Sequence, residues 1–179
     1  ETIYNEYDIP LIEDAAEALG STYKGARAGK FGVGGVHSFH RTKTIATGEG
    51  GVLLLDDDEL FERAKFLRDH GRSSEIAYYT LEATPKYMPS NLQGSMAWAQ
   101  FQRIDELVNR KRYFLHRYKE NLKDIPDLQF NLENDDVVNG VWATTLVFGE
   151  SHDITKLEAI NKLFKLDVPA RPFFYPLSS

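Results

Sequence analysis

The stretch Asp8-Ile-Pro-Leu-Ile-Glu-Asp14, followed by Ala15-Ala-Glu-Ala-Leu19 and Gly20, decides the fold class. Its apolar residues predict a short buried strand with acidic residues at its end, and the alanine-rich segment predicts a helix that stops at Gly20. A strand followed directly by a helix is typical of α/β proteins. Asp14 would then lie at the carboxyl end of a strand, where α/β sheets bind ligands, although a surface or capping role for this carboxylate stays open.

Further segments extend this α/β pattern. Residues 21–35 are rich in glycine and predict strand fragments and turns. Val36-His-Ser-Phe-His40 predicts a strand, and Val52-Leu-Leu-Leu55 predicts a second, fully buried one. A helix is expected to begin at Asp56 and to be closed by Gly71, with Leu60, Ala64 and Leu67 on one face.

The second half predicts one long helix and a smaller α+β unit. Residues 72–89 lack a clean period and predict a long functional loop. Ser90 and Gln93 make a capping-box pair at the start of a helix of about eight turns. Residues 140–148 then predict a strand, and residues 153–166 predict a helix whose inward residues are Ile154, Leu157, Ile160 and Leu163.

The composition is that of an ordinary folded protein. The 179 residues suffice for one domain, or one and part of a second, and 42% are hydrophobic and 27% charged. A net charge of −6 without a basic block argues against a nucleic-acid partner. The longest apolar run, residues 52–55, is too short to cross a bilayer and no leader opens the chain, so we expect a cytoplasmic protein without a membrane partner. The lack of cysteine excludes disulfides and a thiol nucleophile.

Two glycine-rich stretches resemble nucleotide-binding motifs but lack the parts that bind phosphate. Gly32-Val-Gly-Gly35 lacks the third glycine of the dinucleotide fingerprint and precedes a predicted strand rather than a helix, which disfavours a nicotinamide-dependent enzyme. Residues 25–30 miss the P-loop spacing and the hydroxyl residue that follows its lysine. His37 and His40 lie three apart on a predicted strand and so face opposite sides, and no metal site is expected.

Lys43 is the candidate for covalent chemistry. It lies just past a predicted strand, in Ser38-Phe-His-Arg-Thr-Lys43, and the glycines that follow allow close approach of a ligand. Apolar strands on both sides would desolvate the amine and favour Schiff-base chemistry. A solvated loop lysine is the alternative reading.

Several motifs in fixed order resemble the DegT/DnrJ family of pyridoxal phosphate-dependent sugar aminotransferases. Three of them are Ile12-Glu-Asp-Ala-Ala-Glu-Ala-Leu-Gly20, Ser38-Phe-x-x-x-Lys43 and Thr47-Gly-Glu-Gly-Gly51. The resemblance covers nearly the whole chain, and it continues downstream through Leu67-Arg-Asp-His-Gly-Arg72, Ser90-Asn-Leu-Gln93, Ala99-Gln-Phe-Gln-Arg-Ile104 and Arg171-Pro-Phe-Phe-Tyr-Pro-Leu177.

This resemblance implies an α/β fold that is part of a fold-type I transferase. Residues 1–90 would form the later part of the large cofactor-binding domain, a mainly parallel sheet flanked by helices. Residues 91–124 would form a long connecting helix, and residues 125–179 would form part of a small C-terminal α+β domain. Because members of the family are substantially longer, we expect the chain to be an internal or C-terminal excerpt of a homodimeric enzyme.

The resemblance also implies roles for site residues. Lys43 falls on the lysine that forms a Schiff base with pyridoxal 5'-phosphate, and Asp14 on the acid that pairs with the pyridine nitrogen. Ser38 matches a serine that contacts the cofactor phosphate. Glu17 stands where the family often has Gln near the phenolic oxygen. Lys86 stands where many relatives place an Asn that reaches the partner subunit's cofactor phosphate, although a solvated loop lysine is an equal alternative.

The implied activity is transfer of an amino group, with pyridoxamine 5'-phosphate as the intermediate form of the cofactor. Glutamate would be the donor and a nucleotide-linked keto sugar the acceptor, and the perosamine-synthase-like Arg171–Leu177 stretch favours a 4-keto-6-deoxy sugar. Related sugar dehydratases carry His in place of Lys43. His40 and Arg41 would touch substrate or pack at the strand end. The competing hypothesis is a non-catalytic module that binds sugar nucleotides or forms dimers.

Overall fold

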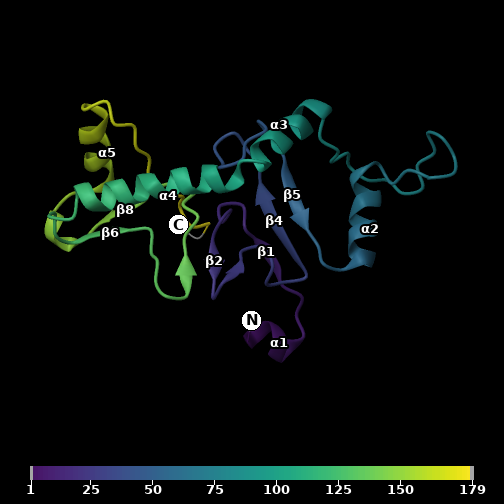
Figure 1. The fold of residues 1–179 in the computed structure, drawn as a ribbon, viewed down its shortest axis with the longest axis horizontal. Coiled ribbons are helices and arrows are strands. Elements are labelled where there is room, and N and C mark those ends of the chain that lie inside the picture. The colour runs from purple at the N-terminus through teal and green to yellow at the C-terminus, as the bar shows by residue number, and fades with distance from the viewer. Residues whose placement is uncertain (1, 178–179) are drawn as a thin grey trace.

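The computed structural model describes residues 2–177, and its first half is built on a three-stranded sheet in the order β1-β4-β5 (Figure 1). The strands are β1 (Ile12–Asp14), β4 (Gly34–Ser38) and β5 (Gly51–Leu54), and a short helix, α1 (Thr2–Tyr7), precedes them. β1 and β4 are parallel, with Asp14 opposite Val36. β5 is antiparallel to β4, with Gly51 opposite Ser38. The expected α/β class is confirmed.

The predicted helix after β1 is wrong. Residues 15–19 form consecutive turns, in which Ala18 N donates to Ala15 O at 2.9 Å and Ser21 N donates to Ala18 O at 2.8 Å. The reason is that Ala15 N donates to Val36 O at 2.9 Å, which extends the pairing with β4 beyond Asp14. Gly20, with a φ of +85°, ends any helix that could start after Ala15. The few residues in between form too few hydrogen bonds to offset the free-energy cost of helix nucleation.

The strands are less buried than the sequence predicts. The exposed fractions are 69% for Ile12, 49% for Leu53 and 39% for Leu54, so the expectation of buried strands over residues 8–14 and 52–55 is wrong for the described chain. Ile12, Val36 and Leu53 share one face of the sheet, because Val36 is opposite Leu53 and strand residues alternate in direction. No described residue covers that face enough to bury these three side chains.

A second small sheet joins the two halves of the chain. It has the order β3-β2-β7 and consists of β2 (Thr22–Tyr23), β3 (Ala26–Arg27) and β7 (Val137–Val138), all antiparallel. The strand fragments predicted for residues 21–35 are therefore confirmed. The pairing of Thr22 with Val138 holds the C-terminal unit against the first half.

The helix α2 (Asp58–Arg68) follows β5 closely as predicted. Its N-cap is Asp57, whose side chain accepts a 2.8 Å hydrogen bond from Leu60 N, so the helix begins slightly later than Asp56. Gly71 closes it with φ +55° and a 3.1 Å hydrogen bond to Phe66 O. Residues 72–89 then form the expected long loop, which extends away from the sheet at the right of Figure 1.

The predicted long helix is two helices, α3 (Asn91–Phe101) and α4 (Ile104–Asn121). The capping box of Ser90 and Gln93 is confirmed at the start of α3. The break comes at Arg103, whose φ of −118° and ψ of 20° are not helical and whose N–H donates to Gln100 O at 3.0 Å, three residues back instead of four. The break contains neither Pro nor Gly, so the sequence carries no signal for it.

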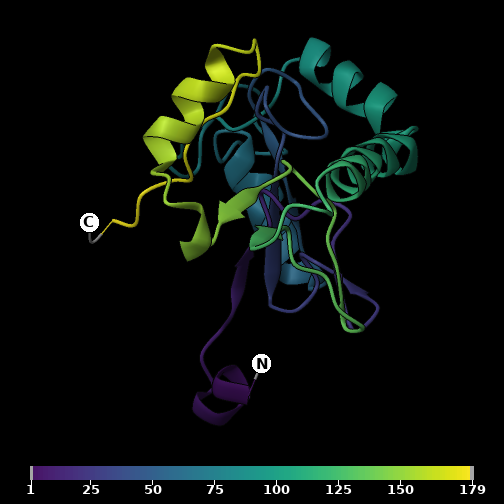
Figure 2. The ribbon, with the colours of Figure 1, turned by 90° about the vertical axis from the view of Figure 1, so that its left-hand side faces the viewer.

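The C-terminal unit contains a strand pair and a helix, and in Figure 2 this yellow-green helix lies at the upper left, away from α4 at the right. β6 (Leu128–Phe130) pairs antiparallel with β8 (Leu146–Phe148), a 3-10 turn, η1 (Glu150–His152), follows, and α5 (Lys156–Phe164) begins at a Thr155–Glu158 capping box. The predicted helix at 153–166 is thus confirmed with shorter bounds. Within it, Ala159 is buried, whereas Leu157 is 61% exposed and its predicted inward position is wrong.

The predicted strand at 140–148 is confirmed only at its end. The segment before β8 is irregular because the Asn131 side chain replaces a strand partner, with its Nδ2 donating to Ala143 O at 3.0 Å and its Oδ1 accepting from Thr145 N at 2.8 Å. Val141 has a φ of +58° and interrupts the extended backbone. It is also one of the two most deeply buried side chains, together with Ile45.

Candidate active site

Two predicted site residues lie at one edge of the β1-β4-β5 sheet. Asp14 ends β1 and Ser38 ends the parallel strand β4, and the register puts both side chains on the same face, because Asp14 is opposite Val36 and Ser38 is two residues further. Asp14 Oδ1 accepts from Ala16 N at 3.1 Å, and Ser38 Oγ accepts from His40 N at 3.2 Å. The Ser38 hydroxyl therefore keeps its own proton for donation.

Lys43 is bounded by a carboxylate and an aromatic ring. Its Nζ donates to Glu17 Oε1 at 2.8 Å, which brings the loops that follow β1 and β4 together. The same Nζ lies 4.2 Å from the ring centroid of Trp142. The Lys43 side chain is only 12% exposed, whereas Glu17 is 46% exposed. The amine is thus partly withdrawn from water at the sheet edge that carries Asp14 and Ser38.

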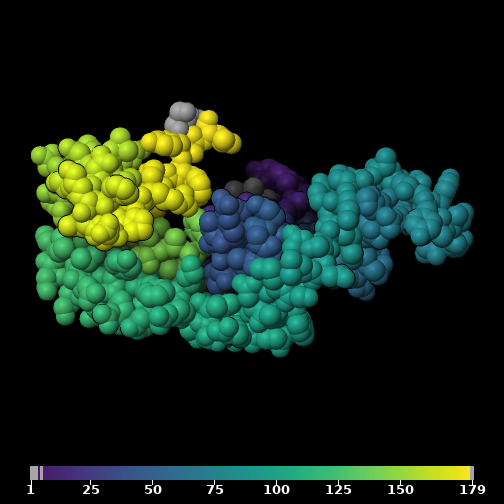
Figure 3. Space-filling model, turned by 90° about the horizontal axis from the view of Figure 1, so that it is seen from above, coloured from purple at the N-terminus to yellow at the C-terminus, as the bar shows by residue number. Residues whose placement is uncertain are grey.

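Helix α3 holds the loop of residues 39–50, here called the Lys43 loop. Gln100 spans both backbone groups of Ala46, accepting from its N–H at 3.0 Å and donating to its carbonyl at 2.8 Å. Gln93 Nε2 donates to Glu49 O at 2.9 Å. Ile45, 1% exposed, anchors the loop centre. Figure 3 shows the blue atoms of this part of the chain between teal α3 and the yellow-green C-terminal unit.

Trp142 brings the C-terminal unit into the site. Its indole Nε1 donates to Thr42 O at 2.9 Å, next to Lys43. The preceding Val141 is a β-branched residue in the left-handed region, a conformation that costs about 1–3 kcal/mol and persists only where the surroundings enforce it. Asn139 Oδ1 accepts from Val141 N at 2.8 Å, and Ser21 Oγ accepts from Gly140 N at 2.9 Å. Trp142 is not among the predicted site residues, because its only signal in the sequence is a tryptophan in a predicted strand.

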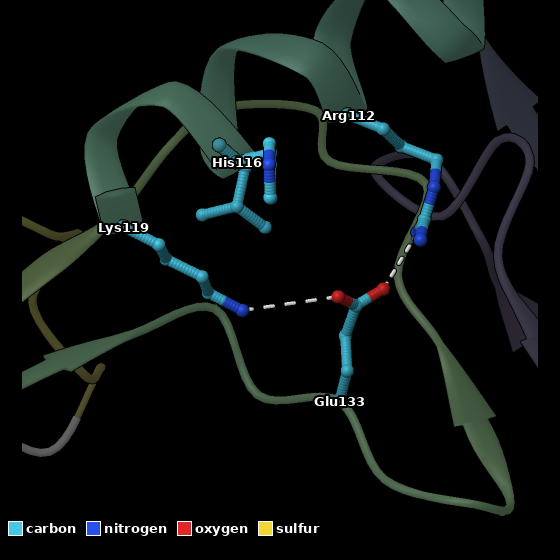
Figure 4. Close-up of a pocket in the computed structure, with 5 residues that line it drawn as sticks. Arg112, His116, Lys119 and Glu133 are labelled. Carbon is cyan, nitrogen blue, oxygen red and sulfur yellow. Dashed lines mark hydrogen bonds and ion pairs between the residues drawn. The ribbon is translucent and has the colours of Figure 1, made fainter. Parts of the chain in front are cut away.

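Glu133 ties this segment to α4 (Figure 4). Its Oε1 accepts from Arg112 at 2.6 Å and from Asn139 N at 3.0 Å, and its Oε2 lies 3.8 Å from Lys119 Nζ. Arg112 also donates to Asn139 O. Glu133, Arg112 and Lys119 border a cavity of about 150 Å³ that Leu115 and His116 complete. Burial by itself would raise the pKa of Glu133, but the Asn139 hydrogen bond and the two cations outweigh it and hold the pKa below its usual value.

The remaining predicted residues are His40, Arg41 and Lys86, and the described part of the chain shows no contact of their side chains with the Lys43 amine. His40 Nδ1 lies 2.9 Å from Thr42 Oγ1, and Arg41 is exposed. Lys86 lies in the exposed 72–89 loop, where its backbone pairs with Asp69, and the described chain shows no contact between it and Lys43. His37 is 6% exposed and alternates with Ser38, so it points to the opposite face of β4.

Two further findings concern ligands and membranes. Among residues 2–177, no cluster of three His, Asp or Glu side chains could hold a metal ion. No helix in the same range is both long and apolar enough to cross a membrane.

The carboxyl edge of β1 and β4 carries a half-buried amine, a carboxylate and a hydroxyl group. This set of groups fits an aldehyde cofactor that has a ring nitrogen and a phosphate.

The chain belongs to the DegT/DnrJ/EryC1/StrS aminotransferase family, whose model matches residues 1–179. The family expected from the motifs is therefore confirmed. The chain is 34% identical, over 98% of its length, to EpsN of Bacillus subtilis (strain 168), and it covers 45% of that protein. EpsN is provisionally named a pyridoxal phosphate-dependent aminotransferase. The chain is 32% identical over 93% of its length to the GDP-perosamine synthase of Escherichia coli O157:H7, again covering 45%.

The fold of the chain is also similar to that of solved aminotransferase structures. The crystal structure of the aminotransferase TlmJ from Streptoalloteichus hindustanus superposes with a TM-score of 0.87 and 25% identity, over 98% of this chain and 48% of that one. The expected fold type is thereby confirmed. The chain spans about half the length of the relatives it matches.

Proposed function

We propose that the protein containing this chain is a pyridoxal phosphate-dependent aminotransferase that moves an amino group from glutamate to a nucleotide-linked keto sugar. The observation that carries the proposal is the half-buried Lys43 amine, 2.8 Å from Glu17 at the carboxyl edge of β1 and β4. A 4-keto-6-deoxy sugar is the favoured acceptor, because several relatives are named GDP-perosamine synthases.

Each site residue has a task that its position supports. When bound, pyridoxal phosphate supplies an electron sink for negative charge that develops on a substrate carbon. Lys43 would hold the cofactor covalently through Nζ and, once freed, would move a proton to or from that carbon. Asp14 would keep a proton on the ring nitrogen. Ser38 would donate its hydroxyl proton to the cofactor phosphate, and Glu17 would orient the Lys43 amine and help to hold the phenolic oxygen.

The proposal extends to the assembly. We place Lys86 at the cofactor phosphate of a partner subunit in a homodimer, which suits its exposed position on the long 72–89 loop. Residues 1–90 and 125–179 would belong to the large and small domains, with α3 and α4 as the connection between them. A cytoplasmic location is part of the same proposal.

The first experiment is an absorbance spectrum of the intact protein with pyridoxal phosphate, recorded before and after glutamate is added. We expect a visible band of bound cofactor that glutamate bleaches, and Lys43→Ala should abolish the band and turnover while leaving far-ultraviolet circular dichroism unchanged. A wild-type protein without the band would contradict the proposal. It would favour a non-catalytic module that binds sugar nucleotides, for which Lys43→Ala has no effect.

A further inference from the structure

We infer that Trp142 is a positioning residue for Lys43, so that the C-terminal unit helps to build the cofactor site. The inference rests on the proposed function for the chemistry at Lys43. The arrangement itself is a clamp with two contacts. The indole N–H donates to Thr42 O at 2.9 Å, which fixes the backbone directly before the lysine. The ring lies 4.2 Å from Nζ and attracts its positive charge.

The two contacts restrict different motions. Lysine has four rotatable side-chain bonds, and the Glu17 ion pair alone leaves several of their combinations accessible. The ring adds a second wall, while the hydrogen bond joins residues 100 positions apart and holds the base of the side chain. Together they direct Nζ to one place at the sheet edge, as productive geometry requires.

The indole is itself held in place. The Phe174 ring stacks on it at 6.5 Å with an interplanar angle of 13°. The Arg171 guanidinium lies 5.2 Å from the Trp142 ring and 4.7 Å from the Phe174 ring. Lys111 Nζ donates to the Trp142 carbonyl at 3.2 Å, which secures the backbone from α4. A tryptophan fixed from this many sides can position a flexible neighbour.

The backbone before Trp142 supports the same conclusion. Val141 adopts a left-handed conformation that β-branched residues avoid, and such strain concentrates at functional sites. It is enforced by Asn139, which accepts from Val141 N at 2.8 Å and whose own N–H donates to Glu133 at 3.0 Å. Glu133, which is paired with Arg112 and Lys119 on α4, thus supports the backbone that leads to Trp142.

The test compares Trp142→Leu and Trp142→Phe with wild type, and uses Trp98→Leu as the control. Trp98 is the other tryptophan of the chain, is 66% exposed on α3 and stacks on Phe101. In the intact protein without cofactor, acylation of Lys43 is measured by peptide mass spectrometry relative to Lys65 in the same digest. With cofactor, the dissociation constant and the visible circular dichroism of bound pyridoxal phosphate are measured.

Trp142→Leu should raise both relative Lys43 acylation and the cofactor dissociation constant by about five- to thirty-fold, because it loses both contacts. Trp142→Phe keeps a ring but loses the N–H, and should fall between Leu and wild type. The visible circular dichroism should weaken in the same order, and Trp98→Leu should match wild type. If Trp142→Leu does not fold, the test of the inference is the Lys43 acylation and the cofactor dissociation constant of Trp142→Phe.

The measurements distinguish a failure of the proposed function from a failure of the inference about Trp142. If the wild-type protein does not bind pyridoxal phosphate, the proposed function fails, and the acylation measurement still decides whether Trp142 positions Lys43. If wild type binds the cofactor but folded Trp142 variants show unchanged Lys43 acylation and an unchanged dissociation constant, the inference is overturned while the proposed function stands.

Discussion

Lys43 Nζ and Glu17 Oε1, from residues 26 apart in sequence, form a 2.8 Å ion pair that joins the loops after β1 and β4. The pair has a direct consequence for cofactor binding. An amine engaged with a carboxylate is not free to attack an aldehyde, so Glu17 competes with an incoming cofactor for Lys43.

Replacement of Glu17 by Gln should therefore speed cofactor capture. Since partly exposed pairs contribute up to about 1 kcal/mol, the expected increase in the second-order rate is about two- to fivefold. Stopped-flow absorbance with pyridoxal phosphate measures this rate. Glu49→Gln is the control, because Glu49 is 80% exposed and lies 3.8 Å from His40, on the same loop. A slower capture in Glu17→Gln would show that Glu17 assists the reaction.

Gln100→Ala should loosen the Lys43 loop. It leaves both backbone groups of Ala46 without their partners, and we expect a loss of about 2 kcal/mol in unfolding free energy. Hydrogen exchange at the Ala46 amide should accelerate more than at the α4 amides. Gln102→Ala, at the end of α3, should change neither quantity, and equal protection of Ala46 in both variants would rule out this function of Gln100.

Lys86→Ala tests the proposed contact between subunits. If Lys86 reaches the cofactor phosphate of a partner, its loss should raise the dissociation constant for pyridoxal phosphate about tenfold without changing Tm of the cofactor-free protein. Lys65→Ala is the matched control, because Lys65 is also exposed and its ammonium contacts only neighbours on its own helix, Glu62 and Phe61, among the described residues. Identical dissociation constants in the two variants would make Lys86 a solvated loop residue.

Glu133 should contribute stability that depends on pH. Its pKa in the folded chain is below that of an unfolded glutamate, about 4.3, so the contribution is present above that pH and is lost as pH falls through the folded value. Glu133→Gln should cost about 1 kcal/mol at pH 7 and less at pH 3.5. Denaturant unfolding at both values measures the difference. Glu120→Gln, from an exposed pair with Lys123, should show no such change.

Two glycines should respond oppositely to alanine. A Cβ at Gly140 would lie 2.1 Å from the backbone oxygen of Leu19, so Gly140→Ala must displace the segment that presents Trp142 and should cost about 2 kcal/mol or more. A Cβ at Gly94 meets nothing within 4 Å in α3, and Gly94→Ala should add about 1 kcal/mol through helix propensity. Thermal unfolding of both variants shows whether Gly140→Ala is destabilised and Gly94→Ala is stabilised. A Gly140→Ala protein as stable as wild type would contradict the close approach of Gly140 to the Leu19 carbonyl.

Local signals explain most of what the sequence predicted correctly. The Ser90–Gln93 capping box and the closure of α2 at Gly71 depend on residues a few positions apart, so a linear pattern contains them. The family motifs likewise led to Lys43, and the structure puts Glu17 beside it. The roles of all five predicted site residues remain predictions, namely Asp14, Glu17, Ser38, Lys43 and Lys86.

The sequence-based predictions are wrong where contacts between residues far apart in sequence determine the local structure. Residues 15–19 form turns because Ala15 is bonded to Val36, and the break at Arg103 has no Pro or Gly to mark it. Val141 adopts a backbone conformation that its β-branched side chain disfavours, so its local preference predicts a strand. Trp142 lies 100 residues from Thr42, and no periodicity brings the two together.

The long-range ties of the Lys43 loop also set an order of events during synthesis. Ala46 is held by a side chain 54 residues downstream, and Thr42 by one 100 residues downstream. A nascent chain that has exposed Lys43 therefore carries an unanchored loop until α3 and then Trp142 leave the ribosome. At about 5–20 residues per second, about 5–20 seconds pass between the synthesis of Lys43 and that of Trp142, and the loop lacks these anchors during that interval.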